Sequence, residues 1–538
     1  MYNNPLKENL VSDNTWFIIA IIIYMLVMVL IGFWSYRKTA HYDEYMLGGR
    51  GLNPFVAAMS AGASDMSGWL LMGLPGALYV TGMSELWIAI GLTIGAWANW
   101  MWVAPRLRSY TEVSRNSITL PSFFENRLRD HSRLLRIIAA LIIIVFFTFY
   151  VSSGMVAGGV YWESTFGGDY LTGMIIVASV TVVYTFVGGF LAVSYTDAVQ
   201  GTIMFFSLII VPVFAILALN NPADIFSFAA SNDYGPYTDG EGNPTYFSMI
   251  TGVSVAAIIG NIAWGLGYFG QPHIVVRFMA LRSPAEAKQG RRIGISWMIL
   301  CLIGATFTAM AATVFFAQNP DFSVTDTRAY ESVFLDLARV LFHPLIAGLV
   351  LTAVLAAIMS TMSSQLLVTA SSLIEDLLHV VKKDGLSQKT LLTLSRATVI
   401  ILSIIAGAMA VNPSDSILGL VGFAWAGFGS AFGPIILAML YWKRLNAPGA
   451  IAGMITGAVV SIVWGSTALG DIIYEIVPGF ALATIAMVIV SLATKAPSEE
   501  ITDEFDTAAR LSHATSMTDE DVDFAEVAQE IKQTPHNP

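Results

Sequence analysis

The sequence contains few charged residues and almost no cysteine. Asp, Glu, Lys and Arg make up only 12% of its 538 residues, against roughly 25% in soluble domains. Cys301 is the one cysteine, which excludes an internal disulfide bond and any cysteine-based metal site. Neither a phosphate-binding loop nor a serine-nucleophile motif occurs. These absences argue against a soluble enzyme and an ATP-driven machine, and nothing suggests a nucleic-acid partner.

Long apolar runs dominate instead. Hydrophobic residues make up 55% of the chain, and uncharged runs near the ~20 residues needed to cross a bilayer recur along it. The clearest run extends from Trp16 to Tyr36. It has no basic segment before it and no small-residue cleavage site after it, so we interpret it as a first span and not as a signal peptide. The composition predicts an all-α polytopic membrane protein in the lipid bilayer.

Thirteen spans are predicted, and the basic residues test that number. The spans are 16–36, 54–81, 85–103, 134–162, 171–187, 190–219, 247–270, 293–317, 344–374, 397–411, 416–442, 449–466 and 472–493. With the N-terminus outside and the C-terminus inside, every Lys and Arg except Lys7, Arg328 and Arg339 falls in an inside loop, at the inside end of a span (Arg136) or in the tail. Arg277 is counted in an inside loop. Residues 1–15 are the predicted extracellular N-terminus, 16–495 the transmembrane domain and 496–538 an acidic cytoplasmic tail, disordered or loosely helical.

The stretch SAGASDMSGWLLMGLPG (60–76) places a carboxylate inside the second span. A charged side chain at that depth costs about 2.5–3.5 kcal/mol, so Asp65 is expected to face an internal cavity. Four glycines and Pro75 favour local unwinding, which a membrane tolerates only where the backbone lines a cavity. The pattern predicts a discontinuous helix at a binding site. Alternatively, the glycines serve close helix packing and Asp65 pairs with an Arg or Lys.

A second interruption is NIAWGLGYFGQPH (261–273). Trp264, Tyr268 and Pro272 recur every four residues and would share one face of an α-helix. The glycines between them weaken that helix. Aromatic rings beside unwound backbone suit a small, partly apolar cationic group. The alternative is a belt of aromatic residues at the membrane interface.

A third interruption is LAAIMSTMSSQLL (355–367). Ala357, Ser360 and Thr361 lie three and four residues apart, on one helix face. Two hydroxyl groups and a backbone carbonyl supply hard, neutral oxygen atoms, which a small alkali cation requires. Alternatively, the hydroxyl groups bond to their own helix or join neighbouring helices.

Weaker signals lie in YTFVGGFLAVSYTDAVQG (184–201) and in the fourth span. Gly188 and Gly189 predict a tight cytoplasmic connection between two spans. Asp197 follows about two turns later and would lie either on an ion path or at a solvated helix end. Tyr150 would reach a cavity or sit in the core.

These segments, together with GFAWAGFGSAFGP (422–434), resemble the sodium/solute symporter family over about residues 15–495, and most closely its proline-transporting members. The resemblance implies ten core helices in two inverted repeats, about 54–219 and 247–442, as in the leucine-transporter fold. Spans two and seven would be the broken helices.

The resemblance also implies functional residues. A sodium site falls on the carbonyls of Ala63, Met66 and Ala357 and the hydroxyls of Ser360 and Thr361. The substrate-binding residues would be Asp65, Ser67, Gly68, Trp69, Tyr150, Trp264, Tyr268 and Pro272. Asp65, Asp197 and Arg50 would act in coupling or on the ion path. The implied activity is uptake of L-proline with one sodium ion across the plasma membrane, by alternating access. Another amino acid, a carboxylate or a vitamin is the alternative solute, and the sequence does not indicate an oligomeric state.

Overall fold

The computed structural model describes residues 5–36, 47–227, 245–322, 324, 330–378 and 388–512. The described chain is helical, apart from turns and one isolated β-bridge between Leu52 and Leu281. Most of the predicted inside loops near 37–46 and 379–387 lies outside the described residues, as does the tail from residue 513 onward.

Helices occupy every predicted span. The first half contains α1 (Pro5–Tyr36), α3 (Pro54–Asp65), α4 (Leu74–Thr81), α5 (Leu86–Ala98), α6 (Ala104–Val113), α7 (Leu120–Leu128), α8 (Leu134–Phe166), α9 (Tyr170–Leu217) and α10 (Asp224–Ser227). The second half contains α11 (Val255–Ala263), α12 (Pro272–Met279), α13 (Ala287–Gln318), α14 (Val333–Leu341), α15 (Pro344–Ser371), α17 (Gln388–Ala410), α18 (Ile417–Tyr441), α19 (Ala447–Gly465), α20 (Ile476–Ala493) and α21 (Glu499–Leu511).

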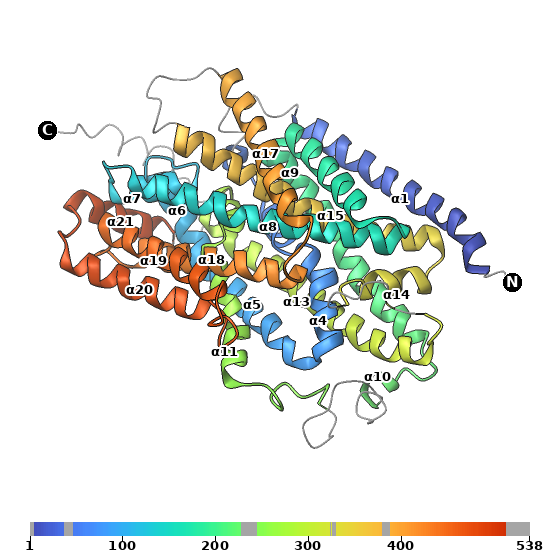
Figure 1. Cartoon of the computed structure of the whole chain (residues 1–538). Helices are drawn as coiled ribbons and strands as arrows, with labels where there is room; N and C mark the ends of the chain where they lie inside the picture. The colour runs from blue at the N-terminus through green and yellow to red at the C-terminus, as the bar shows by residue number, and fades with distance from the viewer. Residues whose placement is uncertain are drawn as a thin grey trace.

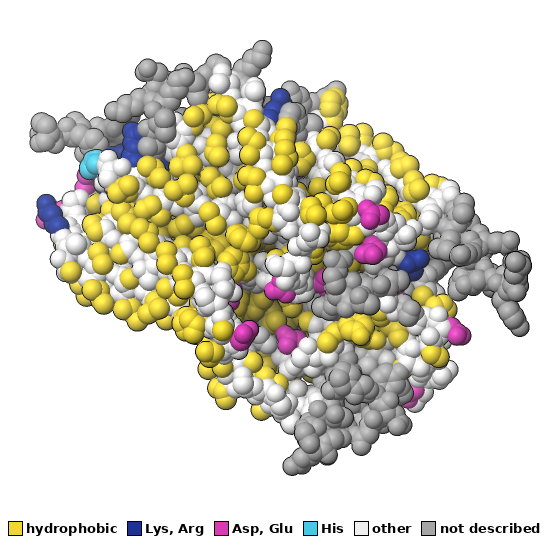
Figure 2. Space-filling view, viewed as in Figure 1, with side chains coloured by type: hydrophobic (Ala, Val, Ile, Leu, Met, Phe, Trp, Pro, Cys, Tyr) yellow, Lys and Arg dark blue, Asp and Glu magenta, His cyan; other side chains and the backbone are white. Residues whose placement is uncertain are grey.

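Length and composition mark ten of the described helical segments as able to cross a membrane, and three shorter apolar segments accompany them. Two of the shorter ones, Trp69–Thr81 and Val255–Gly270, belong to the spans predicted to be broken. Large apolar side chains such as Leu30 and Leu217 are more than 60% exposed, as lipid-facing residues are. Hydrophobic atoms cover much of the face in Figure 2. The prediction of a polytopic helical membrane protein is confirmed; thirteen crossings and their orientation stay predictions.

The central helix is α15, which packs against α1, α3, α8 and α9. Its most apolar window is 83% buried, whereas that of α1 is 28% buried. The start of α1 and the helix α21 lie at opposite ends of the molecule (Figure 1). Helix α15 contains the third predicted interruption and packs against α3, the first part of the broken second span, in the interior of the protein.

Helix α9 contains two predicted spans, 171–187 and 190–219, which meet at one glycine. Gly189 has φ 63° and ψ 176°, outside helical geometry, whereas the flanking residues are helical. Glycine adopts positive φ without the steric cost that a side chain imposes. The predicted tight connection at Gly188 and Gly189 is confirmed.

The seventh span differs from its prediction of 247–270. It begins at Val255, where Ser254 caps α11 through a hydrogen bond from the Ala257 amide, and it continues to Met279. The polar residues that suggested an end at residue 270 are buried inside the protein. Arg277 lies in the last turn of α12 and is only 1% exposed, so it belongs to a helix and not to the predicted loop; the side of the membrane that it faces stays a prediction.

The first part of the acidic tail is an ordered helix. In α21, Ile501, Phe505 and Ala508 recur at helical spacing and are buried. The helix packs on α6, where the Ser109 hydroxyl donates a 2.9 Å hydrogen bond to the Ala508 carbonyl. For residues 499–511 the predicted alternative of disorder is wrong, and the helix that forms is packed, because the acidic composition masked this apolar stripe.

Candidate functional site

The second span is broken at the predicted place. Helix α3 ends at Asp65, and Met66 leaves helical geometry with φ −82° and ψ 73°. The Ser67 amide bonds back to the Asp65 carbonyl at 2.9 Å. A π-helical turn, η2 (Trp69–Gly73), then leads into α4. Ser67 and Gly68 therefore lie in the break, and the predicted discontinuity is confirmed.

The seventh span is broken as well. A 3₁₀ segment, η6 (Trp264–Gly270), separates α11 from α12. Trp264 and Tyr268 are 6% and 4% exposed, so they do not form an interfacial aromatic belt. The prediction that Trp264, Tyr268 and Pro272 share one face was wrong, because three residues per turn place side chains four positions apart about 120° from each other. The three residues line three separate cavities.

Asp65 is joined to Tyr268 across the two broken spans. The Tyr268 hydroxyl donates a short hydrogen bond to Oδ2 of Asp65, and the Trp69 indole donates to the Asp65 carbonyl at 3.1 Å. Oδ1 of Asp65 has no hydrogen-bond partner among the described residues. A cavity of about 20 Å³ adjoins this pair, large enough for one water-sized occupant. The alternative pairing of Asp65 with an Arg or Lys is thus not observed.

The break in the second span is tied to the central helix. The Ser360 hydroxyl of α15 donates to the Ala63 carbonyl at 2.8 Å, and the Thr361 hydroxyl donates to the same oxygen at 3.3 Å. Ser360 also reaches the Ala357 carbonyl of its own helix at 3.1 Å. Four of the five predicted sodium ligands therefore meet at one point, and the fifth, Met66, is the non-helical residue beside them. The alternative uses of the hydroxyl groups, bonding within the helix and between helices, are both present.

A buried ion pair lies nearby, and the sequence did not reveal its basic member. Nη2 of Arg277 is 3.2 Å from Oδ2 of Asp197, with side chains 1% and 0% exposed. The Ser60 hydroxyl donates to the same Asp197 oxygen at 2.7 Å, and Arg277 also donates to the Ser364 hydroxyl at 2.7 Å. The pair therefore connects α3, α9, α12 and α15. Asp197 is not at a solvated helix end.

Tyr150 of α8 faces another polar residue that the sequence reasoning missed. Its ring meets that of His273 edge-on at a centroid distance of 5.7 Å. Both residues are buried, and neither the Tyr150 hydroxyl nor the two imidazole nitrogens have hydrogen-bond partners among the described residues. His273 follows Pro272 at the start of α12. The predicted seventh span, 247–270, stops before His273, so the sequence did not indicate that this residue would lie in the interior.

Arg50 lies in the segment before α3, away from Asp65 and the hydroxyl pair of α15. Its guanidinium donates to the Met279 carbonyl at 2.9 Å, to the Thr111 hydroxyl at 3.0 Å and to the Ser117 carbonyl at 2.9 Å. These bonds join the segment before α3 to α6 and to the end of α12. Arg50 thus contacts neither Asp65 nor the hydroxyl pair of α15 directly.

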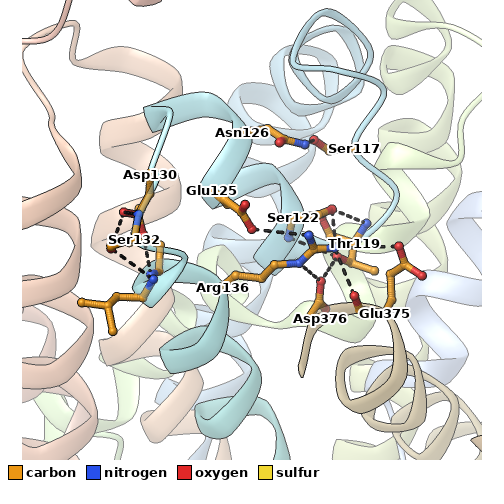
Figure 3. Close-up of polar contacts among 12 residues, drawn as sticks. Ser117, Thr119, Ser122, Glu125, Asn126, Asp130, Ser132, Arg136, Glu375 and Asp376 are labelled. Atoms are coloured by element: carbon orange, nitrogen blue, oxygen red, sulfur yellow. Dashed lines mark hydrogen bonds and ion pairs between the residues drawn. The ribbon is translucent and has the colours of Figure 1, made fainter. Parts of the chain in front are cut away.

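A polar network joins the start of α8 to η8 (Ser372–Leu378), which continues from α15. Nε of Arg136 is 2.8 Å from Oδ1 of Asp376, and the Thr119 hydroxyl donates to the same oxygen at 2.8 Å (Figure 3). Glu125 approaches Arg136 at 3.4 Å. A small cavity of about 30 Å³, lined by Thr119 and Pro272, lies beside the network. This predicted cytoplasmic end is closed.

The opposite end is open. A cavity of about 630 Å³, here the outer cavity, is lined by Trp264, Phe423 and Tyr474, among others. Figure 2 shows a hollow with acidic side chains around it on the displayed face. The predicted orientation places the loops that contribute Asp415 and Asp471 to this cavity outside the cell.

Comparisons with known proteins agree with this architecture. The chain is 51% identical over 478 residues to the high-affinity proline transporter PutP of Bacillus subtilis, covering 89% of this chain and 98% of that protein. It is 48% identical over 493 residues to the sodium/proline symporter of Escherichia coli, covering 91% and 96%. Both relatives are named transporters, so the prediction of a transporter and not an enzyme is confirmed.

The fold is also found among solved structures. A substrate-bound, outward-open sodium-coupled sialic acid symporter matches with a TM-score of 0.73 at 19% identity, covering 90% of this chain and 99% of that one. The model of the sodium:solute symporter family matches residues 45–457. With the two broken spans in place, this chain belongs to the sodium:solute symporter family.

Proposed function

We propose that this protein takes up L-proline across the plasma membrane by alternating access, one sodium ion with one proline. Relatives named as proline transporters share 51% and 48% of their aligned residues with it. The observation that carries the proposal is the attachment of the broken second span to α15, where the Ser360 and Thr361 hydroxyls meet the Ala63 carbonyl.

Sodium would bind where those groups converge. Each hydroxyl has two lone pairs besides its donor hydrogen, so rotation turns it from donor to ligand. The carbonyls of Ala63, Met66 and Ala357 complete five oxygen ligands. Because Ala63 and Met66 flank the point where α3 ends, the ion would hold the break in one shape.

Proline would bind beside that break, among Ser67, Gly68, Trp69, Tyr150, Trp264, Tyr268 and Pro272. Amides at the start of a helix attract a carboxylate, and α12 begins at Pro272, one of these residues. The unpartnered Tyr150 hydroxyl supports a polar ligand on this side. Since Trp264 and Pro272 line separate cavities, they would contact proline in different states of the transport cycle.

Coupling would pass through the acids and Arg50. Asp65 bonds to Tyr268, so it links the sodium-side break of α3 to the second broken span. Asp197 connects four helices through Arg277. Arg50 attaches the start of α3 to the end of α12 on the closed side.

One sodium ion is energetically sufficient. A tenfold sodium gradient supplies ~1.4 kcal/mol, and a membrane potential of about 150 mV adds ~3.5 kcal/mol. Their sum supports an accumulation of several thousandfold. The second candidate function is the same transport cycle with another small solute. A sugar fits the aromatic site residues less well than proline does.

Uptake into proteoliposomes tests the proposal. Labelled proline is expected to accumulate only with an inward sodium gradient, and excess unlabelled proline should compete better than other amino acids or pantothenate. Thr361→Ala should abolish sodium-driven uptake. Thr369→Ala is the matched control, because Thr369 bonds only within α15, to the Gln365 carbonyl at 2.7 Å. Uptake by Thr361→Ala with unchanged sodium dependence would remove Thr361 from the site.

A further inference from the structure

The outer cavity is lined by a carboxylate that does not cap the helix it precedes, that of Glu475. Glu475 occupies the N-cap position of α20, where acidic side chains ordinarily accept a hydrogen bond from the first turn, yet its side chain makes none. Although it is only 8% exposed, it forms no ion pair with a described residue.

The side chain is directed into the cavity. Glu475 lines it, and its carboxylate lies against Gly465 at the end of α19. A Cβ at position 465 would be 3.1 Å from Oε1, so the absence of a side chain there leaves room for the carboxylate. A buried acid that points to an open cavity is positioned for a ligand from solution.

Its surroundings suit a cation. Asp415 and Asp471 line the same cavity, and the described residues around it include no Lys, Arg or His. One wall is aromatic: the rings of Trp264 and Tyr474 stack at a centroid distance of 5.2 Å. A 2.6 Å hydrogen bond from the Tyr474 hydroxyl to the Gly422 carbonyl fixes that wall. Acids in a concave site concentrate cations, and aromatic faces attract them.

We propose that Glu475 and Asp415, beside the rings of Trp264 and Tyr474, form an outer site for a monovalent cation. The occupant is sodium or the ammonium group of the amino-acid substrate. This inference rests on the proposed function for its role in transport. Because Trp264 belongs both to this wall and to the broken seventh span, a cation held here lies at the entrance to the membrane-embedded site. The outer site would therefore raise the rate of loading and leave the later steps unchanged.

The test uses the full-length protein with Glu475→Gln and Asp415→Asn. Asp321→Asn is the matched control, an exposed acid on the same predicted side that does not line the outer cavity. In proteoliposomes, each test variant should raise the half-saturation concentration of sodium or of proline about three- to tenfold and retain its maximal rate. This change is small beside the 10–10³-fold effects that electrostatic steering has on association rates. A change in sodium dependence at saturating proline identifies sodium as the occupant. A change in proline dependence at saturating sodium identifies the ammonium group. Unchanged half-saturation in both variants, or a loss of maximal rate alone, overturns the proposal.

Binding without transport separates this inference from the proposed function. Tryptophan fluorescence of purified protein is titrated with sodium chloride or L-proline, with choline chloride as the ionic-strength control. A response weakened by both Glu475→Gln and Asp415→Asn, in protein that elutes as one peak, supports the outer site even if wild-type proteoliposomes fail to accumulate proline. Equal responses in wild type and both variants refute the outer site even if proline uptake is normal.

Discussion

The Ser360 hydroxyl donates a 2.8 Å hydrogen bond to the carbonyl oxygen of Ala63, 297 positions earlier in the chain. Ala63 lies in the last turn of α3, two residues before the helix ends, whereas Ser360 lies in the buried middle of α15. The bond therefore joins an irregular point of the backbone to a deeply buried helix. A cation bound at this junction would stabilise the folded state specifically.

Sodium is accordingly expected to stabilise the protein against thermal unfolding. At a concentration 100 times its dissociation constant, an ion that binds only the native state adds about 2.7 kcal/mol. Ser360→Ala removes one ligand and should diminish the rise in Tm that sodium causes relative to potassium. Ser403→Ala serves as the control, because that hydroxyl bonds within its own helix, to Val399. An identical sodium effect in Ser360→Ala would contradict the assignment.

Loss of the hydroxyl group should affect stability at only one of the two tyrosines near the break. Tyr268→Phe leaves the Asp65 carboxylate without its donor, which should cost about 1.5–3 kcal/mol of unfolding free energy. Tyr150→Phe removes a hydroxyl that has no described partner, so stability should be unchanged while the KM for proline rises. Chemical unfolding in detergent, paired with uptake kinetics, measures both. Equal destabilisation by the two substitutions would argue against this distinction.

The stability of the protein should depend on Arg277 and Asp197 together, because each compensates the buried charge of the other. Arg277→Gln leaves an uncompensated buried charge and should destabilise the protein by about 3–5 kcal/mol. Adding Asp197→Asn should recover part of that loss. Arg282→Gln is the comparison, because Arg282 pairs with Glu286 at the surface and surface pairs contribute about 0–1 kcal/mol. If the double variant is as unstable as the sum of the single variants, the pair is not coupled.

The docking of α21 should depend on pH. Burial raises the pKa of Glu504 from its ordinary 4.5 to about 6, against the opposing effect of Arg129, whose guanidinium is 2.6 Å away. The docked helix thus holds this proton more tightly than the free helix. The protonated Glu504 side chain therefore stabilises the docked helix fully below pH ~4.5, and this stabilisation is lost as the pH rises through about 6. Other charged groups around it are Arg115, Arg127, Glu500, Asp506 and Lys443.

Hydrogen exchange measures this dependence. After correction for intrinsic rates, amides of α21 should be better protected at pH 5 than at pH 7.5. Glu504→Gln should remove most of the difference, whereas Glu499→Gln, on the exposed side of the same helix, should not. Protection that rises with pH in the wild type would show that the ion pair with Arg129 dominates instead.

Both broken spans could be predicted from local sequence. An acid, several glycines and a proline within one apolar run identify the break after Asp65, because each feature is unfavourable in a continuous lipid-embedded helix. The same reasoning failed at the end of the seventh span. Gln271, His273 and Arg277 are polar, and a window of sequence contains no indication that they are buried. Arg277 is tolerated there because Asp197, 80 residues earlier, compensates its charge.

The sequence by itself determined the membrane-embedded helical architecture and the positions of the polar interruptions within it, because these depend on composition and on spacing within single segments; the proposed sodium and substrate residues followed from the family resemblance. Only the tertiary structure decided which of these residues meet. It brought Ser360 and Thr361 to Ala63, directed Trp264 and Tyr268 to different cavities through one stretch of 3₁₀ geometry, and left Glu475 facing the outer cavity. Such pairings arise from the packing of helices far apart in the chain, and no local pattern encodes them.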